Sequence, residues 1–427
     1  MKTINQATSV SRRHFIKSAC RVTAGLALSA KAPFIHAKKY PTLRVLGTHV
    51  TLQESLRLRA QQELGIEIAY EPGGDAEVLQ KAISNPDSFD LYEQWTDSIT
   101  VLWRTNAIQA IETERLTYWN EINNLAKTGR LKENDQIGAG DAPHKLLFIQ
   151  KDHALGSQDT GKISFLPYVH NADSFGYDLR YIQRGKPYET ESWGWLLEQS
   201  HRGHVGLVNS PSIGIFDAAL AAQAQGLMRF KDIGNMSREE IDQLFSILIE
   251  FKHQGHFSGL WNSVPESVEF FTSGRTTIAS MFSPGISALN GLGIPVVYAA
   301  PKEGYRAWHG VMCLSSATRG YAKEAAYKYM NWWLSGWPGA FIARQGYYIS
   351  NPQRSRPLLS EDEWNYWYAG KPTNIPLKNT QGQVAIKPGE FRNGGSYEKR
   401  FSNVAVWNTV MDTYEYSLPR WHEFLLS

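Results

Sequence analysis

Two serine side chains at the start of a predicted helix are candidates for binding a ligand. The phrase Asn209-Ser210-Pro211-Ser212 opens a helical stretch, so both serines lie beside free backbone N–H groups and the positive end of a helix dipole. Such a position can hold a carboxylate, a phosphonate or a sulfonate. Alternatively, Ser210 or Ser212 simply caps its own helix. Both interpretations stay open.

Aromatic and acidic side chains form a second candidate set at the ends of predicted strands. Trp95 and Asp97 follow the strand that starts at Asp90, while Phe282 and Trp308 lie on or beside later strands. A cation that leaves water needs a paired charge or the face of a ring, and these residues offer both. The alternative is that the aromatic side chains belong to the core. The other candidate ligand-binding residues are Thr48, His49, Ser283 and His309.

Motifs of known catalytic chemistry are missing from the sequence. There is no Gly-x-Ser-x-Gly elbow, His-Glu-x-x-His motif, Walker glycine loop or paired-cysteine metal spacing. Four histidines, at positions 49, 144, 153 and 309, could share a metal, but their spacing gives this no support. The glycine-rich stretch 393–397 follows no strand and is expected to be a loop before the last helix. We therefore expect no enzyme activity, no cofactor and no metal.

The N-terminal segment has the pattern of a twin-arginine export signal. Arg12 and Arg13 stand in the phrase Ser-Arg-Arg-His-Phe-Ile-Lys, ahead of a mild apolar run without acidic residues. Small residues between Ala30 and Lys38 offer cleavage sites, the best of them after Ala37. A basic amphipathic helix at the start of a cytosolic protein is the alternative. The pattern predicts a signal at 1–37 and a folded, periplasmic product.

Removal of this signal changes the charge and the cysteine count of the protein. The whole chain carries 44 basic and 41 acidic residues, and six of the basic residues lie within 1–37. The remaining 38 basic and 41 acidic residues argue against nucleic-acid binding. Cys20 lies in the signal, so Cys313 is left alone in the apolar run Val-Met-Cys-Leu and is expected in the core.

The mature chain repeats strand, loop and helix at the spacing of βαβ units. Expected strands lie at 42–47, 66–70, 90–92, 205–208, 277–282 and 295–298, and expected helices at 52–64, 75–83, 193–197, 209–225, 237–253, 321–334 and 404–424. Such units form parallel sheets whose ligands bind at the carboxyl ends of the strands. The irregular stretch 138–161 is expected to be a surface insertion rather than a flap over a cleft.

The order of the later elements resembles a family of importer proteins. A strand at 278–282, a strand at 295–298, the phrase Pro301-Lys302-Glu303-Gly304, Ala307-Trp308, a helix at 322–334 and Gly346-Tyr347 follow one another, and Trp193-Gly194-Trp195 precedes them. This order resembles the spermidine/putrescine-binding branch of ABC-importer solute-binding proteins, over nearly the whole mature chain.

The resemblance implies a two-lobe α/β fold of the periplasmic binding protein type. Each lobe would be a mixed, mostly parallel sheet flanked by helices, with the ligand cleft between the lobes. Lobe I is expected to hold 38–165 and 306–345, and lobe II 166–305 and 346–427. The chain would cross between them near Leu166, Tyr305 and Gln345. The partners implied are a small-molecule ligand, an inner-membrane ABC permease and, during export, the twin-arginine translocase, with the protein itself a monomer.

The residues that grip amines in this branch are largely replaced. The position of an ammonium-binding aspartate holds Gly310, that of a loop tryptophan holds Thr48, and acidic residues after the strand of lobe II give way to Asn209, Ser210 and Ser212. Asp75 and Asp97 remain as partners for one amine. The expected ligand is therefore a small zwitterion or anion. The alternatives are a polyamine, an iron-carrying role, and a sensory protein that presents its ligand to a receptor.

Overall fold

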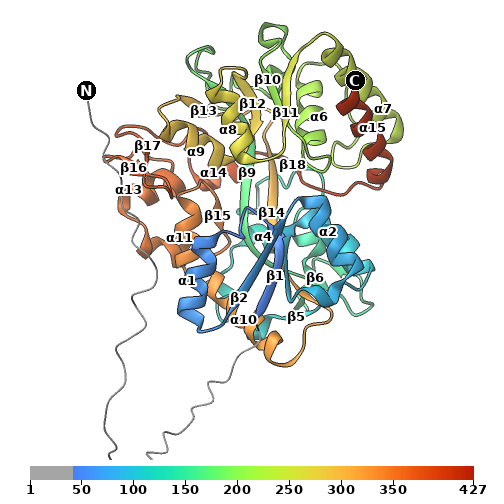
Figure 1. Ribbon diagram of the computed structural model, residues 1–427, viewed down its shortest axis with the longest axis vertical. Helices are drawn as coiled ribbons and strands as arrows, with labels where there is room; N and C mark the ends of the chain where they lie inside the picture. Colours follow the sequence, from blue (N-terminus) through green and yellow to red (C-terminus); the bar gives the residue numbers. More distant parts are fainter. Residues whose placement is uncertain (1–41) are drawn as a thin grey trace, which may run out of the picture. The chain divides into compact units, whose positions relative to one another are not determined.

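The computed structural model describes residues 42–427 and is shown in Figure 1. The predicted export signal, its cleavage site and Cys20 lie outside the described residues. Within residues 42–427, no helix is long and apolar enough to cross a membrane.

A mixed sheet of twelve strands runs through the described chain. Its main order is β11-β10-β12-β9-β14-β3-β1-β2; β13 and β15 also pair with β9, and β4 and β18 with β14. Its members are β1 (Leu43–Thr48), β2 (Ile68–Gly73), β3 (Leu91–Trp95), β4 (Ile108–Gln109), β9 (Leu166–Asp178), β10 (Val205–Val208), β11 (Phe257–Trp261), β12 (Ile278–Met281), β13 (Val296–Tyr298), β14 (Tyr305–Ser315), β15 (Tyr348–Ile349) and β18 (Val404–Trp407).

Lobe I is built on the parallel strands β1, β2 and β3, which confirms the predicted βαβ units. Leu56 and Ala60 bury one face of the first connecting helix, and Val78 and Ala82 that of the second. The first helix ends at Gly65, whose positive φ suits glycine. The helices of this lobe are α1 (Glu54–Leu64), α2 (Asp75–Ser84), α3 (Ile99–Arg104), α10 (Gly320–Trp333) and α11 (Trp337–Ala343).

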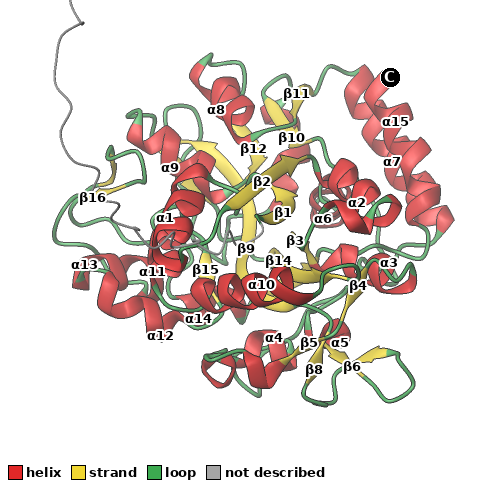
Figure 2. Ribbon diagram, turned by 60° about the horizontal axis from the view of Figure 1, so that its bottom comes forward, coloured by secondary structure: helices red, strands yellow, loops and turns green. Residues whose placement is uncertain are grey.

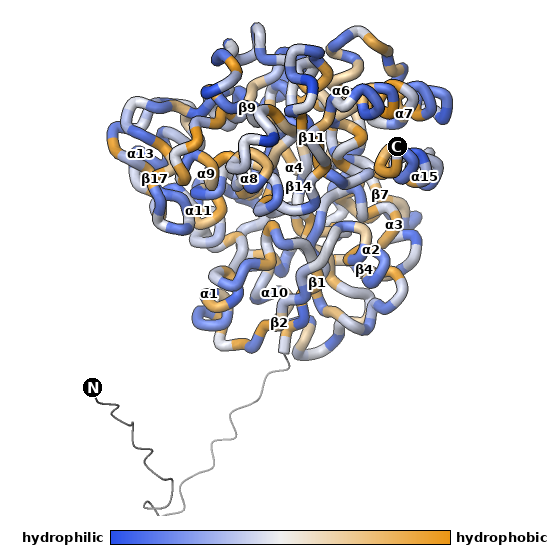
Figure 3. Tube along the Cα trace, turned by 45° about the horizontal axis from the view of Figure 1, so that its top comes forward, coloured by the Kyte–Doolittle hydropathy of each residue, from blue (hydrophilic) through white to orange (hydrophobic). Residues whose placement is uncertain are grey.

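Lobe II repeats the arrangement with the parallel strands β10, β11 and β12. Its helices are α6 (Gly214–Ala224), α7 (Arg238–His253), α8 (Val264–Thr272), α9 (Ser283–Gly291) and α15 (Tyr414–Leu426). The predicted capping box is present at the start of α7, where Ser237 and Glu240 bond each other's backbone N–H groups. Figure 2 shows α7 and α15 side by side at one edge, and Figure 3 shows the mixture of hydrophilic and hydrophobic residues along α7.

Two long antiparallel strands, β9 and β14, carry the chain between the lobes. Every residue of both strands is buried, and both stand near the centre of Figure 1. One part of β14 pairs with β3 of lobe I, while β9 pairs with β12 of lobe II. Near Gln345 the chain returns to this region and adds β15 to β9. These strands pair with both lobes and connect them.

Two expectations about local structure need correction. The expected helix 404–424 is instead the strand β18 followed by α15, because the run Val-Ala-Val-Trp, with two β-branched valines, pairs with β14. The stretch 193–197 is helical as expected, in the form of a short 3₁₀ helix. The segment 138–161 is not irregular throughout: it holds α5 (His144–Leu147), β6 (Phe148–Ile149) and β7 (Leu155–Gly156), which join β5 (Ile111–Glu112) and β8 (Lys162–Ile163) in a small sheet.

The buried apolar side chains form one main cluster in each lobe and a third around the C-terminal segment. Cys313 lies fully buried in the first cluster, as predicted. The third cluster packs the C-terminal segment against β9 and β14. The short elements not yet named are α4 (Asn124–Thr128), α12 (Pro352–Ser355), α13 (Glu361–Trp364), β16 (Leu377–Lys378), β17 (Val384–Ile386) and α14 (Tyr397–Phe401).

Candidate functional site

A small aromatic cavity lies where the two lobes meet. Its volume is about 10 Å³, which is roughly the space that one water molecule needs. Both lobes line it, mostly with residues that follow the carboxyl ends of strands, where α/β sheets place their ligands. We call it the interlobe cavity, and its lining residues are Val50, Trp95, Asp173, Ile213, Phe282, Trp308, Tyr347 and Asn408.

Four aromatic rings form most of the wall of the interlobe cavity. Trp308, on β14, packs edge-on against Trp95 of lobe I, with 4.9 Å between the ring centroids. Tyr347 packs edge-on against Trp308 at 5.5 Å. Phe282 comes from lobe II, where it leans on Trp261 at 5.1 Å. Ring faces and edges from both lobes therefore surround the same small space.

One carboxylate, that of Asp173 on β9, reaches this cavity. Its Oδ2 accepts a hydrogen bond from Trp308 Nε1 at 2.7 Å, and its Oδ1 accepts from Asn171 at 2.7 Å and from Tyr298 at 2.9 Å. A carboxylate has about four acceptor positions, so one position on Oδ2 is left, and Arg306 Nη2 lies 3.7 Å from this same oxygen. Burial raises the pKa of Asp173, and the charge of Arg306 opposes this effect.

Behind Asp173 lies a buried charge cluster. Arg306 Nε donates to Asp217 at 2.6 Å, Arg306 Nη2 lies 3.7 Å from Asp173, and Arg306 Nη1 donates to Asn408 at 3.1 Å. All three charged side chains are fully buried. Two carboxylates against one guanidinium leave this cluster with one negative charge. The arginine is therefore fully neutralised and offers no positive charge to a ligand.

A second contact between the lobes lies next to the cavity. Ser210 and Ser212 of lobe II donate to the carboxylate of Asp75 at the start of α2, at 2.6 and 3.3 Å. Asp97 is buried nearby with one oxygen unpartnered. Burial raises the pKa of Asp97 to about 7, and the negative charge of Asp75 acts in the same direction. We call these four residues the serine–aspartate contact.

The structure brings six of the ten predicted site residues to this region. Trp95, Phe282 and Trp308 line the interlobe cavity, and Asp97, Ser210 and Ser212 belong to the serine–aspartate contact. His49 is exposed in the turn after β1 and lines an adjoining groove of about 490 Å³, which shares Val50 and Tyr347 with the interlobe cavity.

The remaining three predicted site residues do not line the interlobe cavity. Thr48 is buried at the end of β1, and Ser283 lines a different cavity in lobe II. His309 is fully buried, stacks on His170 at 4.7 Å and lies within 3.0 Å of the Gly310 carbonyl. Successive side chains of a strand face opposite sides, so His309 and Trp308 cannot both face the cavity. Of residues 42–427, no three His, Cys, Asp or Glu side chains are grouped so that they could hold a metal ion.

Several lining residues escaped the sequence analysis, above all Asp173, Tyr347 and Asn408. Asp173 stands in β9 among other polar residues, His170, Asn171 and Ser174, and so carried no distinct local signal. Tyr347 and Asn408 carried none either. They reach the cavity through the pairing of β15 with β9 and of β18 with β14, at large sequence separation.

Residues 59–362 match the family of bacterial extracellular solute-binding proteins. This span is more than half of the chain, and the protein belongs to that family. No curated protein sequence matches the chain.

Solved structures share the fold over 90% of this chain. A spermidine/putrescine ABC transporter from Listeria monocytogenes has 13% identity and a TM-score of 0.62 over 98% of its own length. The spermidine/putrescine ABC transporter substrate-binding protein PotD from Streptococcus pneumoniae has 12% identity and a TM-score of 0.58 over 99%. The TpPotD lipoprotein of Treponema pallidum has 13% identity and a TM-score of 0.59 over 100% of its own length. The likeness establishes the two-lobe fold.

Proposed function

We propose that this protein is the solute-binding component of an ABC importer and that it captures a small solute through a single ammonium group. The observation that carries the proposal is the interlobe cavity, whose eight lining residues include four aromatic rings and one carboxylate and no Lys, Arg or His. Two structural neighbours are described as spermidine/putrescine ABC transporters, which supports a transport role and an amine-bearing solute.

The chemistry of the cavity favours a cation. An ammonium group that leaves water is stabilised by ring faces and by a carboxylate, and Trp308 and Asp173 offer both within one hydrogen-bonded pair. An anion would face the net negative charge around Arg306. At the start of α6 an anion would also meet the carboxylate of Asp75, because Ser210 and Ser212 already donate to it. The solute is therefore an organic cation or the ammonium end of a zwitterion.

A long polyamine fits this cavity less well. A second ammonium would need a second carboxylate, and Asp173 is the single acidic residue of the lining. Gly310, where the resemblance places an aspartate in polyamine binders, is tightly enclosed: a Cβ atom there would come within 2.7 Å of the Val169 carbonyl oxygen. The chain thus has no room for that acidic side chain.

Solute capture requires the lobes to open. The interlobe cavity holds about 10 Å³, too little for any organic solute, and side chains of both lobes close it. Movement about β9 and β14 would separate Trp95 and Trp308 from Phe282 of lobe II, and Asp75 from the serines. A solute that contacts both lobes then stabilises the closed form through its higher affinity for that form.

Further parts of the proposal concern location and partners. We infer that the protein is exported by the twin-arginine route, works in the periplasm as a monomer without enzyme activity or cofactor, and delivers its solute to an inner-membrane ABC permease. The family description, extracellular, supports export.

The test is a thermal-shift screen followed by calorimetry. One-ammonium solutes such as choline and γ-aminobutyrate are compared with putrescine and with succinate, since ligand binding to the native state raises its melting temperature. Binding of a one-ammonium solute that is lost in Trp308→Ala supports the proposal. The matched control is Trp103→Ala, because Trp103 is half-buried and bonds the His153 carbonyl away from the cavity.

Two results would overturn the proposal. Binding of succinate without binding of any one-ammonium solute would show that the cavity takes anions. Putrescine binding that is tighter than that of every one-ammonium solute would show that a second carboxylate takes part.

A further inference from the structure

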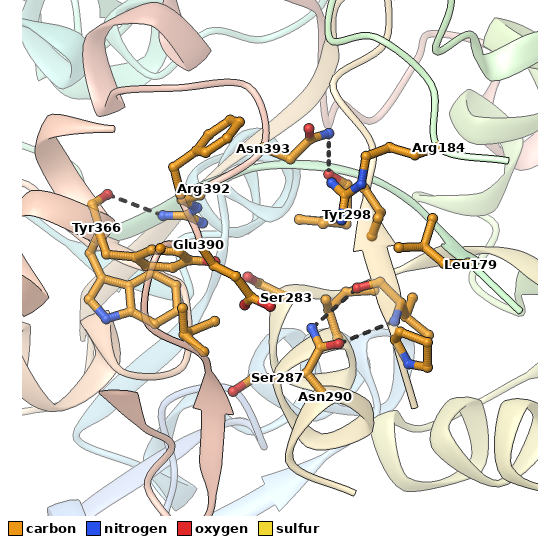
Figure 4. A pocket seen from close by; sticks show the side chains of 18 of the residues that line it. Leu179, Arg184, Ser283, Ser287, Asn290, Tyr298, Tyr366, Glu390, Arg392 and Asn393 are labelled. Carbon is orange, nitrogen blue, oxygen red and sulfur yellow. Dashed lines mark hydrogen bonds between the residues drawn. The ribbon is translucent and has the colours of Figure 1, made fainter. Parts of the chain in front are cut away.

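A second cavity of about 340 Å³ lies in the lobe II part of the molecule, beside α9, β13 and the loop before α14. Figure 4 shows Arg392, Glu390, Ser283 and Asn290 around it. It is separate from the interlobe cavity but adjoins it, because Phe282 lines the one and Ser283 lines the other. We call it the arginine cavity.

The charges of the arginine cavity are unbalanced. Its lining includes Arg184, Arg392 and Arg400 but a single acidic residue, Glu390, which gives a net charge of +2. Arg184 and Glu390 are exposed, whereas Arg392 and Arg400 are buried. Among residues 42–427, no acidic side chain lies within ion-pair distance of these three arginines.

Arg392 is held by neutral groups alone. Its Nη2 donates to the Gly346 carbonyl at 2.6 Å and its Nη1 to the Trp367 carbonyl at 3.4 Å. Its guanidinium lies over the rings of Tyr348 and Trp367, at 4.7 and 5.1 Å from their centroids. Burial lowers the pKa of Arg392, and the positive charge of Arg400 acts in the same direction. Of its five N–H groups, three remain for another acceptor.

Arg400 is held in the same way. Its Nη1 donates to the Tyr305 hydroxyl and to the Asn393 carbonyl, and its Nη2 donates to the Ala172 carbonyl. Its Nε is buried without a partner. The buried carboxylate of Glu191 bonds Asn393 and other neutral donors instead of an arginine.

Arg306, another buried arginine of this chain, has carboxylate partners. Arg306 has Asp217 at 2.6 Å and Asp173 at 3.7 Å, as a buried guanidinium requires. An arginine cannot lose its proton to escape this requirement. Two neighbouring buried guanidinium groups without a carboxylate, beside a cavity of this size, therefore lack an anion.

The other walls of the cavity indicate what kind of anion fits. Ile286, Val296, Trp367 and Phe391 supply an apolar surface, and the buried Ser287 hydroxyl has no partner. We propose that the arginine cavity binds a small organic carboxylate with an apolar, ring-sized body, independently of the solute in the interlobe cavity. The carboxylate meets the free N–H groups of Arg392 and Arg400, and the body lies against the apolar wall. Binding is strengthened by Arg184 and opposed by Glu390 at the mouth.

The experiment is a ligand-observed ¹⁹F NMR titration with 4-fluorobenzoate, and with neutral 4-fluorobenzamide as its matched control. We expect saturable binding of the benzoate, with a Kd of about 1 mM or tighter. Loss of the charge-assisted hydrogen bonds should make the amide bind roughly 10- to 100-fold more weakly.

Two exposed residues at the mouth give variants that should fold normally and act in opposite directions. Arg184→Gln should weaken benzoate binding, and Glu390→Gln should tighten it, each about 2- to 5-fold. Arg392→Gln, measured after circular dichroism has shown it to be folded, should abolish binding. Trp308→Ala should leave benzoate binding unchanged, because Trp308 lines the other cavity.

Several outcomes would overturn the inference. Absence of saturable benzoate binding, or equal binding of the amide, would show that the arginines serve packing alone. Loss of benzoate binding in Trp308→Ala would place the anion in the interlobe cavity. An unchanged affinity in both mouth variants would likewise contradict a charge-driven site.

Discussion

Replacing Asp173 by asparagine separates the charge of this residue from its shape. In the structure Asp173 accepts three hydrogen bonds and has one acceptor position left, which we assign to the ammonium group of the solute. Asparagine keeps one oxygen, which can still accept from Trp308 Nε1. Its new amide group can face Asn171, whose Oδ1 is buried without a partner and becomes an acceptor after a turn of that side chain. The variant should therefore fold, at a cost below about 2 kcal/mol.

The main expected effect of Asp173→Asn is weaker binding of the solute. Hydrogen bonds to charged groups contribute about 1.5–3 kcal/mol, so Asp173→Asn should weaken the binding of a one-ammonium solute roughly 10- to 150-fold. The matched control is Asp217→Asn, which removes the same charge from the cluster around Arg306 but does not line the interlobe cavity. Calorimetry is performed at a temperature at which circular dichroism shows both variants to be folded.

The comparison of these two variants decides between contact and distant charge. A large loss in Asp173→Asn with a much smaller one in Asp217→Asn supports direct recognition by Asp173. Equal losses would show that only the net charge matters. An affinity of Asp173→Asn equal to that of the native protein would refute the assignment of this carboxylate to the ammonium group.

Three further predictions follow from the lobe contacts, the buried acids and the N-terminus. The double variant Ser210→Ala and Ser212→Ala removes hydrogen bonds from the closed form, so calorimetry should show solute binding about 10-fold weaker; unchanged affinity would show that this contact does not hold the lobes closed. Burial raises the pKa of Asp97 from its ordinary value to about 7, so the folded protein binds this proton more tightly than the unfolded chain does. Its stabilising effect is complete below about pH 4 and is lost as the pH rises to 7. The melting temperature should therefore fall from pH 5 to pH 8, and less so in Asp97→Asn; equal slopes would contradict this origin. Replacing Arg12 and Arg13 by lysine should block export in a cell-fractionation assay, and normal periplasmic accumulation would contradict the twin-arginine signal.

The sequence was a good guide wherever local patterns decide the structure. The parallel strands β1 to β3 and the capping box at Ser237 follow from periodicity and from short-range hydrogen bonding. The run at 404–407 was misassigned to a helix because a short apolar run fits either a strand or a helix, and only its pairing with β14 decides.

The candidate site was predicted in part, for a physical reason. Strand ends and helix starts can be read locally, and they pointed to Trp95, Phe282 and the serines at the start of α6. The partners of these residues cannot be read locally. Asp75 lies 135 residues from Ser210 in the sequence, and Asp173 meets Trp308 only because β9 and β14 pair. The ligand class and the exact lobe boundaries stay predictions.

The most direct test of solute recognition by the interlobe cavity is a crystal structure of the protein grown with the tightest-binding one-ammonium solute of the screen. We expect the solute between the lobes, with its ammonium group beside Asp173 Oδ2 and its carbon atoms against Trp95, Trp308 and Tyr347. A solute bound outside the interlobe cavity, or one whose ammonium group points away from Asp173, would contradict this expectation.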